Sequence, residues 1–315
     1  MTETLQQPAS TDNLTRQETW KDKVVRFFRT KPLGAIGLVV VLIYIFVAIF
    51  ATLLAPFDPL LIDYEQILGA PSTTHWLGSD EFGRDMLSRI IYGSRTAMFV
   101  GFAASLTGAG IGLFIGVASA YFGGTIDLIT QRVVDVFMSF PLIILALAIV
   151  TIIPKVDVES LPWFLHWIPE IIVNTMPVVM AITIPMIPRC ARVVRSSALA
   201  LREVPYVDAA RALGFTHWRI IYRHMVPNVM APFLIMLTAF MGQAVLLEAS
   251  LSFLGLGVQE PTPAWGLMLQ GGAEQYAESA PWIAIFPGIA ITTSVFAFNL
   301  FGDALRDVLD PKLRV

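Results

Sequence analysis

The sequence predicts an all-α protein that crosses a membrane six times. Of its 315 residues, 56% are hydrophobic and only 14% are charged, whereas soluble domains carry about 25% charged residues. A water-soluble core cannot absorb this excess, so the composition indicates a membrane protein. Six apolar runs approach the ~20 residues that a helix needs to cross a bilayer. They lie at 33–54, 97–121, 136–153, 171–188, 229–254 and 281–301.

The first apolar run is interpreted as a retained membrane anchor. It is longer than the core of a signal peptide, which spans about 7–15 residues, and it shows no clear small-residue cleavage site. Before it lies a polar segment at 1–32, of which 1–19 is predicted to be disordered because it holds few apolar residues and no aromatic one. The runs at 136–153 and 171–188 are short and contain proline, so their ends are the least defined.

Lysine and arginine set the expected orientation, because cytoplasmic loops of membrane proteins are enriched in both. Of the 21 residues of these types, 17 lie in the segments 1–32, 122–135, 189–228 and 302–315. Both termini are therefore predicted to face the cytoplasm. The opposite segments are acidic, and 255–280 holds three glutamates with no lysine or arginine. Those carboxylates are either merely excluded from the inside or serve a docking role.

The polar stretch Asp208–Asn228 lies between two apolar runs and predicts two short helices around a glycine. Pro205 suits a first helical turn, and Asp208 lies where the helix dipole favours a carboxylate. Gly214 suits a left-handed cap that ends the first helix. Thr216 suits the N-cap of the second helix.

The second helix of this stretch is predicted to be amphipathic and to end at Pro227. Arg219 and Arg223 would share one face. Its apolar face would hold the residues at i, i+3, i+4 and i+7, which are Trp218, Ile221, Tyr222 and Met225. Periodicity alone leaves open an amphipathic helix lying on anionic lipid, with a nucleic-acid-binding helix-turn-helix as a weaker alternative.

Motifs of enzymes and metal sites are absent from the sequence. Cys190 is the single cysteine, which excludes an intramolecular disulfide. The four histidines form neither an HExxH motif nor a Cys/His cluster, so no metal site is expected. No GxxxxGK[ST] phosphate loop and no GxSxG elbow occurs. We therefore expect a non-catalytic chain that binds no cofactor itself.

The cytoplasmic stretch resembles the EAA loop of the membrane subunits of type I ABC importers. That pattern consists of Glu-Ala-Ala, a glycine after three more residues, and an isoleucine and a proline downstream. The matching residues here are Asp208-Ala209-Ala210, Gly214, Ile220 or Ile221, and Pro227. Aspartate in place of glutamate at 208 keeps the charge and shortens the side chain by one methylene.

A second motif resembles one subunit type of that family. His75–Arg95, HWLGSDEFGRDMLSRIIYGSR, is similar to the HxLGTDxxGRDxxSRxxxGxR signature of the C-type subunits of dipeptide, oligopeptide and nickel permeases, with Ser79 in place of threonine. Further matches are LEASLSFLGLG, Trp265-Gly266 and the tail FNLFGDALRDVLDPKLR. The resemblance runs from about Lys31 to the C-terminus. The Pro- and Trp-rich stretch 152–169 is longer than the turn usual there.

The resemblance implies the type I ABC importer permease fold, with a cytoplasmic coupling helix, in a bacterial inner membrane. A first helix at 33–54 and an outer segment at 55–95 would precede a five-helix domain at 96–304, with the coupling loop at 189–228 and a tail at 305–315. The implied function is import of short peptides, with nickel or other small solutes as minor options. An ion-driven secondary transporter would need several midplane ionisable residues and often inverted repeats, and a non-transporting anchor would explain none of the motifs.

The family also implies partners. The chain would form the pore with a second permease, receive substrate from an extracytoplasmic binding protein, and be powered by separate ATPase chains that bind ATP and Mg²⁺. The residues implied to couple to the ATPase are Asp208, Ala209, Ala210, Gly214, Phe215 and Arg219. The outer signature is Asp80, Gly83, Arg84, Asp85 and Arg89. It would form either an interfacial helix in which Asp85 pairs with Arg89, or a landing surface for the binding protein.

Glu248 is a carboxylate inside the fifth apolar run, where ionisable residues are costly and usually face a cavity or a partner. With Ser250 and Ser252, it is a candidate for lining or gating the outer end of the pathway. The alternative is a structural carboxylate that fixes the turn at Gly255 and Gly257. On the first reading, Glu248→Gln cuts uptake while assembly survives.

Two further patterns concern helix packing. A stripe of small residues in the second run suits close helix contact, either within the chain or with the second permease; it consists of Gly108, Gly112 and Gly116. An internal salt bridge that braces the coupling loop is expected from Asp127, Arg132 and Asp135.

Overall fold

The computed structural model describes residues 20–154, 169–276 and 278–309. Within this part the chain is all-α, as predicted, and its β-type pairing is limited to one isolated bridge between Ser79 and Asp85. The predictions for 1–19, for most of 152–169 and for the end of the tail fall outside the described residues.

The longer helices are α1 (Trp20–Thr30), α2 (Pro32–Ile49), α4 (Met86–Phe122), α5 (Gly124–Met138), α6 (Leu142–Ile152), α7 (Glu170–Arg202), α10 (Met230–Phe253), α11 (Trp265–Gln275) and α12 (Trp282–Leu309). Shorter elements are α3 (Ala51–Leu54), the 3₁₀ turn η2 (Tyr64–Gln66), α8 (Pro205–Ala212), α9 (His217–Ile220), the π turn η5 (Ile221–Met225) and the 3₁₀ turn η6 (Val226–Val229).

Five helices of the described part are long and apolar enough to cross a membrane, namely α2, α4, α7, the helix from His217 to Phe253, and α12. The sixth candidate is the pair α5 and α6, which is bent by 92°. The third predicted span, 136–153, falls on this bent pair, since α5 ends at Met138 and α6 covers Leu142–Ile152. Pro141 lacks an N–H donor and disfavours helix at the residue before it, so the chain breaks between Met138 and Leu142.

Several helices extend beyond their apolar runs. α4 begins at Met86 rather than near 97, and α7 continues to Arg202, well past the predicted end at 188. The expected loop at 189–228 is therefore shorter, because its first part is the polar end of α7. Hydropathy marks the stretch that can lie in lipid, whereas a helix continues as long as its backbone bonds are satisfied.

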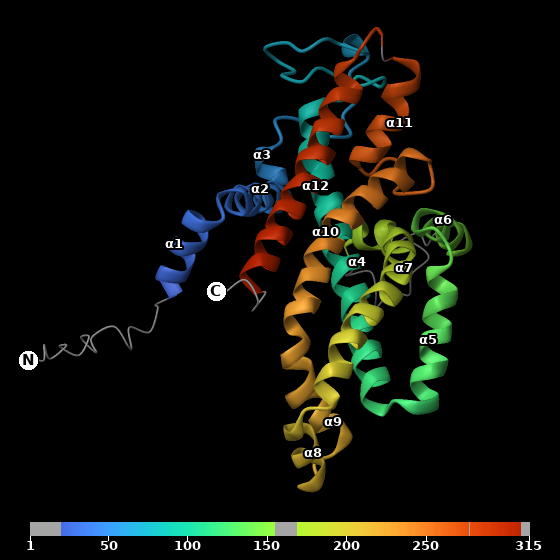
Figure 1. Ribbon diagram of the computed structural model, residues 1–315. Coiled ribbons are helices and arrows are strands. Elements are labelled where there is room, and N and C mark those ends of the chain that lie inside the picture. The colour runs from blue at the N-terminus through green and yellow to red at the C-terminus, as the bar shows by residue number, and fades with distance from the viewer. Residues whose placement is uncertain (1–19, 155–168, 277, 310–315) are drawn as a thin grey trace, which may run out of the picture.

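The core of the bundle is the packing of α4 against α7, with α10 and α12 beside α4 and α2 against α12 (Figure 1). The glycine stripe of α4 faces α7: a Cβ on Gly112 would lie 2.6 Å from Cys190 Cβ, and one on Gly116 would lie 2.5 Å from the Ala191 carbonyl oxygen. Of the two alternatives for the stripe, the structure places it in the chain's own bundle.

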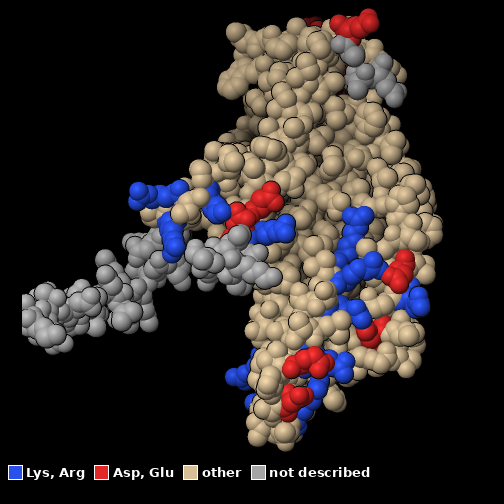
Figure 2. Space-filling view, in the orientation of Figure 1, with Lys and Arg blue, Asp and Glu red and all other residues tan. Residues whose placement is uncertain are grey.

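The two ends of the bundle differ. At one end, α8 and α9 project beyond the ends of α1 and α12, while the segment between α3 and α4 covers the opposite end together with α11 (Figure 1). Figure 2 shows charged side chains gathered around the projecting end and an upper flank that is nearly free of them on this face. This distribution fits a bundle that lies in lipid and extends α8 and α9 into water.

Candidate coupling loop and outer cluster

The turn between α8 and α9 follows the predicted pattern. Pro205 begins α8, and Gly214 adopts a left-handed φ of +74° just after that helix ends. The backbone N–H of Phe215 reaches back to the carbonyl oxygen of Ala210 at 3.1 Å, which closes the helix end. The Thr216 hydroxyl accepts a hydrogen bond from the N–H of Arg219 and caps α9. The result is a compact knob of two helical segments.

The second helix does not end at Pro227, contrary to the prediction. α9 continues through the π turn η5 and the 3₁₀ turn η6 into α10, so one helix runs from His217 to Phe253. Pro227 lies at the start of η6, where a missing N–H costs little, and the neighbouring π and 3₁₀ turns take up the change in hydrogen bonding. The knob is thus continuous with a membrane-spanning helix.

The predicted apolar face of that helix is half wrong. Ile221 and Met225 are buried, but the Trp218 and Tyr222 side chains are 67% and 54% exposed, and Ile220 is buried instead. The wider π turn rotates the helix face relative to a regular 3.6-residue period. Trp218 and Tyr222 therefore belong to the outward surface of the knob.

Some of the candidate coupling residues face solvent and others are buried or half-buried. The residues that face solvent are Asp208, Ala209, Gly214 and Arg219. Ala210 is buried and Phe215 is half-buried below the Arg219 guanidinium, 4.2 Å from the ring centre. Leu213 is 73% exposed at the tip, and the family pattern gave no reason to single it out. An exposed apolar tip surrounded by charge is the surface a protein partner would cover.

The knob is attached to the end of α4. Tyr121 Oη lies 2.8 Å from His217 Nδ1, and the Arg211 guanidinium lies 5.1 Å from the centre of the Tyr121 ring. Asp208 pairs with Arg211 at 3.0 Å within α8. The knob therefore contacts α4 directly and continues into α10.

The two aspartates expected to form a salt bridge beside the coupling loop do form ion pairs, but with arginines of α7. Asp127 of α5 pairs with Arg195 of α7, at 2.6 Å from its Nε and 2.5 Å from its Nη2. Asp135 pairs with Arg192, one turn earlier on α7. Arg132 takes part in no ion pair within the described residues, so its predicted role was wrong. The two pairs join α5 to the polar extension of α7, which sequence periodicity had not placed opposite α5.

The first part of the outer signature, Asp80–Arg84, forms a turn, whereas Asp85 is the N-cap of α4 and Arg89 lies in that helix. Asp80 Oδ1 accepts hydrogen bonds from the N–H groups of Phe82 and Arg84, both at 2.9 Å. Gly83 has a φ of +78°, and a Cβ there would lie 1.9 Å from the Asp63 carbonyl oxygen. Only glycine fits this turn, which packs against the preceding outer segment.

The predicted pair between Asp85 and Arg89 is wrong. Asp85 is the N-cap of α4: its Oδ2 accepts from the Ser88 N–H at 2.8 Å, and its Oδ1 lies 2.9 Å from His75 Nδ1. A capping carboxylate turns back onto the first helical turn and cannot reach a residue four positions ahead. The Arg89 guanidinium instead approaches Asp80 and Glu260.

The pKa values of Arg84 and Glu81 are shifted by burial and by the charges of this cluster. Burial alone would lower the pKa of Arg84, but its hydrogen bond to Glu260 and the charges of Asp80 and Glu260 outweigh burial and raise it. Burial raises the pKa of Glu81, with the neighbouring Asp80 acting in the same direction. Glu260, which sequence reasoning did not single out, thus ties the segment after α10 to the start of α4.

Glu248 and Ser252 lie together inside the chain. Glu248 is 0% exposed, and its Oε1 accepts a hydrogen bond from Ser252 Oγ at 2.8 Å. Ser252 Oγ accepts in turn from the Val258 N–H at 3.2 Å. Ser250 points elsewhere and donates to the Leu246 carbonyl. These contacts are those of a structural carboxylate that holds the turn after α10, and a place for Glu248 on the pathway remains a prediction.

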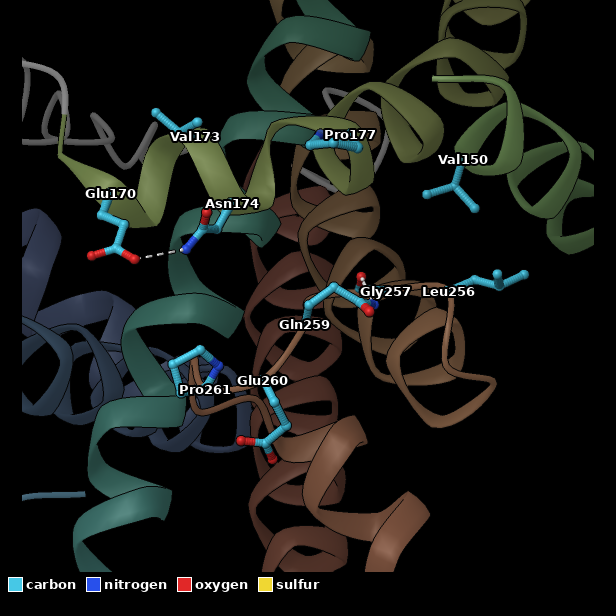
Figure 3. A pocket seen from close by; sticks show the side chains of 10 residues that line it. All are labelled: Val150, Glu170, Val173, Asn174, Pro177, Leu256, Gly257, Gln259, Glu260 and Pro261. Carbon is cyan, nitrogen blue, oxygen red and sulfur yellow. Dashed lines mark hydrogen bonds between the residues drawn. The ribbon is translucent and has the colours of Figure 1, made fainter. Parts of the chain in front are cut away.

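A pocket opens beside that turn (Figure 3). It has a volume of about 210 Å³ and lies between α6, the first turns of α7 and the segment 256–261. No spacing in the sequence brings these three parts together, so sequence reasoning had not found it.

A bundle of apolar helices long enough to cross a membrane, with an exposed knob at one end, is the architecture of an integral membrane protein. Residues 108–315 match the family described as binding-protein-dependent transport system inner membrane component, and residues 18–71 match the N-terminal transmembrane domain of oligopeptide transport permease C. The chain belongs to this family, as one of its C-type ABC importer permeases.

Relatives with assigned roles match over nearly the whole chain. The dipeptide transport system permease protein DppC of Alkalihalophilus pseudofirmus is 38% identical over 308 residues, covering 98% of this chain and 94% of that one. The glutathione transport system permease protein GsiD of Pectobacterium atrosepticum is 38% identical over 296 residues, covering 94% and 92%. A chain of the inward-facing MetNI methionine ABC transporter aligns with a TM-score of 0.51 at 20% identity, covering 71% of this chain and 98% of that one. At this identity, the last likeness concerns the fold alone.

Proposed function

We propose that this chain is the C-type permease of an ATP-driven importer of short peptides. It forms the translocation pore with a second permease and receives peptides from an extracytoplasmic binding protein. Import of peptides is supported by relatives whose names specify dipeptides and glutathione, which is itself a short peptide. The chain catalyses no reaction and binds no cofactor; ATP and Mg²⁺ are bound by partner ATPase chains.

The observation that carries the proposal is the knob formed by α8 and α9. Its tip exposes Leu213 and Trp218 amid charged side chains, and it is continuous with α10 and bonded to α4 through Tyr121 and His217. A lever needs a surface that a partner can grip and a stiff connection to the parts it moves. When ATP closes the ATPase chains, the knobs of the two permeases approach one another and the bundle opens outward.

The proposed orientation follows from the same knob. α8 and α9 face the cytoplasm with both termini, in a bacterial inner membrane, because the arginine-rich end of the molecule is the end that holds them (Figure 2). The outer cluster around Asp80 then lies on the opposite surface, within reach of a binding protein.

The test is affinity purification of the tagged chain in mild detergent. Wild type is expected to co-elute with a second permease and with ATPase chains, identified by mass, and to hydrolyse ATP. Gly214→Pro is expected to retain the permease and lose the ATPases, because proline cannot adopt the φ of +74° found there. Gly110→Ala is the control, since a Cβ at Gly110 would meet nothing within 4 Å. Wild type that elutes alone without ATPase activity would contradict the proposal.

A further inference from the structure

The pocket beside the turn after α10 is acidic. Its charged lining residues in the described part of the chain are two carboxylates, Glu170 from the first turn of α7 and Glu260 from the segment after α10. The amides of Asn174 and Gln259 complete the polar side, and the opposite side is aliphatic, with Val150 of α6 among its members (Figure 3). Such a lining offers acceptors to a cation and an apolar surface to its hydrocarbon part.

Among the described residues, no arginine, lysine or histidine forms an ion pair with the Glu170 carboxylate. The Asn174 Nδ2 group donates to Glu170 Oε1 and to Thr262 Oγ1, both at 3.4 Å. These long bonds orient the amide while its carbonyl oxygen remains an acceptor. Figure 3 shows the Glu170 side chain directed toward Asn174.

Glu260 pairs with two arginines and keeps part of its side chain exposed. Its Oε2 accepts from Arg84 Nη1 at 2.8 Å, and its Oε1 accepts from Arg89 Nη2 at 3.2 Å, yet its side chain is 44% exposed. The same two arginines also form ion pairs with Asp80. With Glu170 added, carboxylates outnumber guanidinium groups around the pocket, so its field attracts a cation.

The wall of the pocket is held in place before any ligand arrives. Gln259 Nε2 donates to the Gly257 carbonyl oxygen at 3.1 Å, and Val258 is tied through Ser252 to the buried Glu248. A Cβ on Gly257 would lie 2.1 Å from Ser252 Oγ, so no residue with a side chain fits at this position of the turn. Preformed polar groups of this kind are typical of small-molecule sites.

We propose that this pocket is a subsite for a primary ammonium group of the transported peptide, with Glu170 as its main counter-charge. An ammonium offers three donors, for which the Glu170 carboxylate and the carbonyl oxygen of its neighbour Asn174 are acceptors, while Glu260 adds negative charge to the same lining. A volume below about 300 Å³ suits one end of a peptide rather than a whole oligopeptide. The inference rests on the proposed function and names the part of the substrate that this chain recognises.

Uptake in cells tests the proposal. A strain that lacks this chain receives the wild-type gene, Glu170→Gln, Glu170→Asp or Glu170→Lys, and import of radiolabelled alanyl-alanine and alanyl-lysine is measured at saturating concentration. Glu170→Gln should lower the uptake rate about threefold to fivefold, the effect of one partly exposed ion pair. Glu170→Asp should keep most of the rate, and Glu170→Lys should abolish uptake. The variants should assemble normally, because Glu170 is exposed at a helix start.

Glu65→Gln is the matched control, since Glu65 is an exposed outer carboxylate that does not line the pocket. A loss with both peptides assigns the site to the α-amino group, and a loss with alanyl-lysine alone assigns it to a lysine side chain. Normal import of both peptides by Glu170→Gln and Glu170→Lys would overturn the subsite and leave the importer intact. Absence of import by the wild type would instead contradict the proposed function, and this inference with it.

Discussion

Tyr121 Oη lies 2.8 Å from His217 Nδ1, which joins the last turn of α4 to the first residue of α9. The bond spans 96 positions in the sequence. α4 also packs along α7 through its glycine stripe, so the knob, α4 and α7 form one mechanical unit. We propose that a movement of α8 and α9 is passed through these contacts to the centre of the bundle.

Tyr121→Phe should uncouple ATP hydrolysis from import. The variant keeps the ring beneath Arg211 and loses only the bond to His217, which is worth about 1 kcal/mol. We expect more ATP hydrolysed per peptide imported, with unchanged assembly, in reconstituted transporter. Tyr64→Phe serves as the control, because Tyr64 is 78% exposed in the outer turn η2, away from the knob. An unchanged ratio of ATP to peptide in Tyr121→Phe would count against this link.

Asp127→Asn should destabilise the complex more than Asp135→Asn. Both carboxylates pair with arginines of α7, but the Asp127 and Arg195 side chains are 16% and 27% exposed, against 51% and 44% for Asp135 and Arg192. An exposed ion pair contributes at most about 1 kcal/mol to the free energy of unfolding, and screening by water reduces this contribution further. Thermal unfolding in detergent should show the lower Tm for Asp127→Asn. Equal Tm values for the two variants would contradict the proposed brace.

Gly112→Leu should separate α4 from α7. A Cβ at this position would lie 2.6 Å from Cys190 Cβ and 2.8 Å from the Ile187 carbonyl oxygen, so the helices must move apart. Overpacking of this kind costs about 1–3 kcal/mol. Gly110→Leu is the control on the open side of the same helix. Size-exclusion chromatography should show loss of folded complex for the first variant and not for the second.

The sequence was sufficient for the class of fold and for the knob, because both depend on local rules. Apolar runs mark helices that can lie in lipid, and Gly214 and Thr216 end and begin helices through their own backbone geometry. Prediction failed where a contact depends on distant residues. Arg89 pairs with Glu260, 171 positions away, instead of with Asp85.

The π turn at Ile221–Met225 shows a different limit. The helix continues past Pro227 and Trp218 faces outward, although the proline predicts a helix end and a 3.6-residue period predicts a buried tryptophan. The pocket beside Glu170 was missed for the same reason as the ion pairs. Its walls come from α6, α7 and the turn after α10, and no periodicity within one segment records how three segments meet.

Glu81→Gln should change the pH dependence of stability. Burial raises the pKa of Glu81, so the folded chain holds this proton more tightly than the unfolded chain does. Its stabilising contribution is complete below the unfolded pKa near 4.3 and is lost as the pH rises through the folded pKa. The Tm of Glu81→Gln relative to wild type should therefore increase between about pH 4 and pH 7. A difference in Tm that does not vary with pH would contradict the raised pKa of this partly buried carboxylate.

Glu248→Gln separates the two roles considered for the carboxylate of α10. Glutamine keeps an oxygen that accepts from Ser252 Oγ, so a structural role predicts normal assembly and normal uptake. Glu248→Leu removes this acceptor and releases the Ser252 hydroxyl, which should lower stability by about 1–3 kcal/mol and loosen the turn at Val258. If Glu248 instead acts through its charge on the pathway, Glu248→Gln would reduce uptake although the complex assembles. Since the side chain is 0% exposed within this chain, we expect retained uptake in Glu248→Gln and a lower Tm in Glu248→Leu.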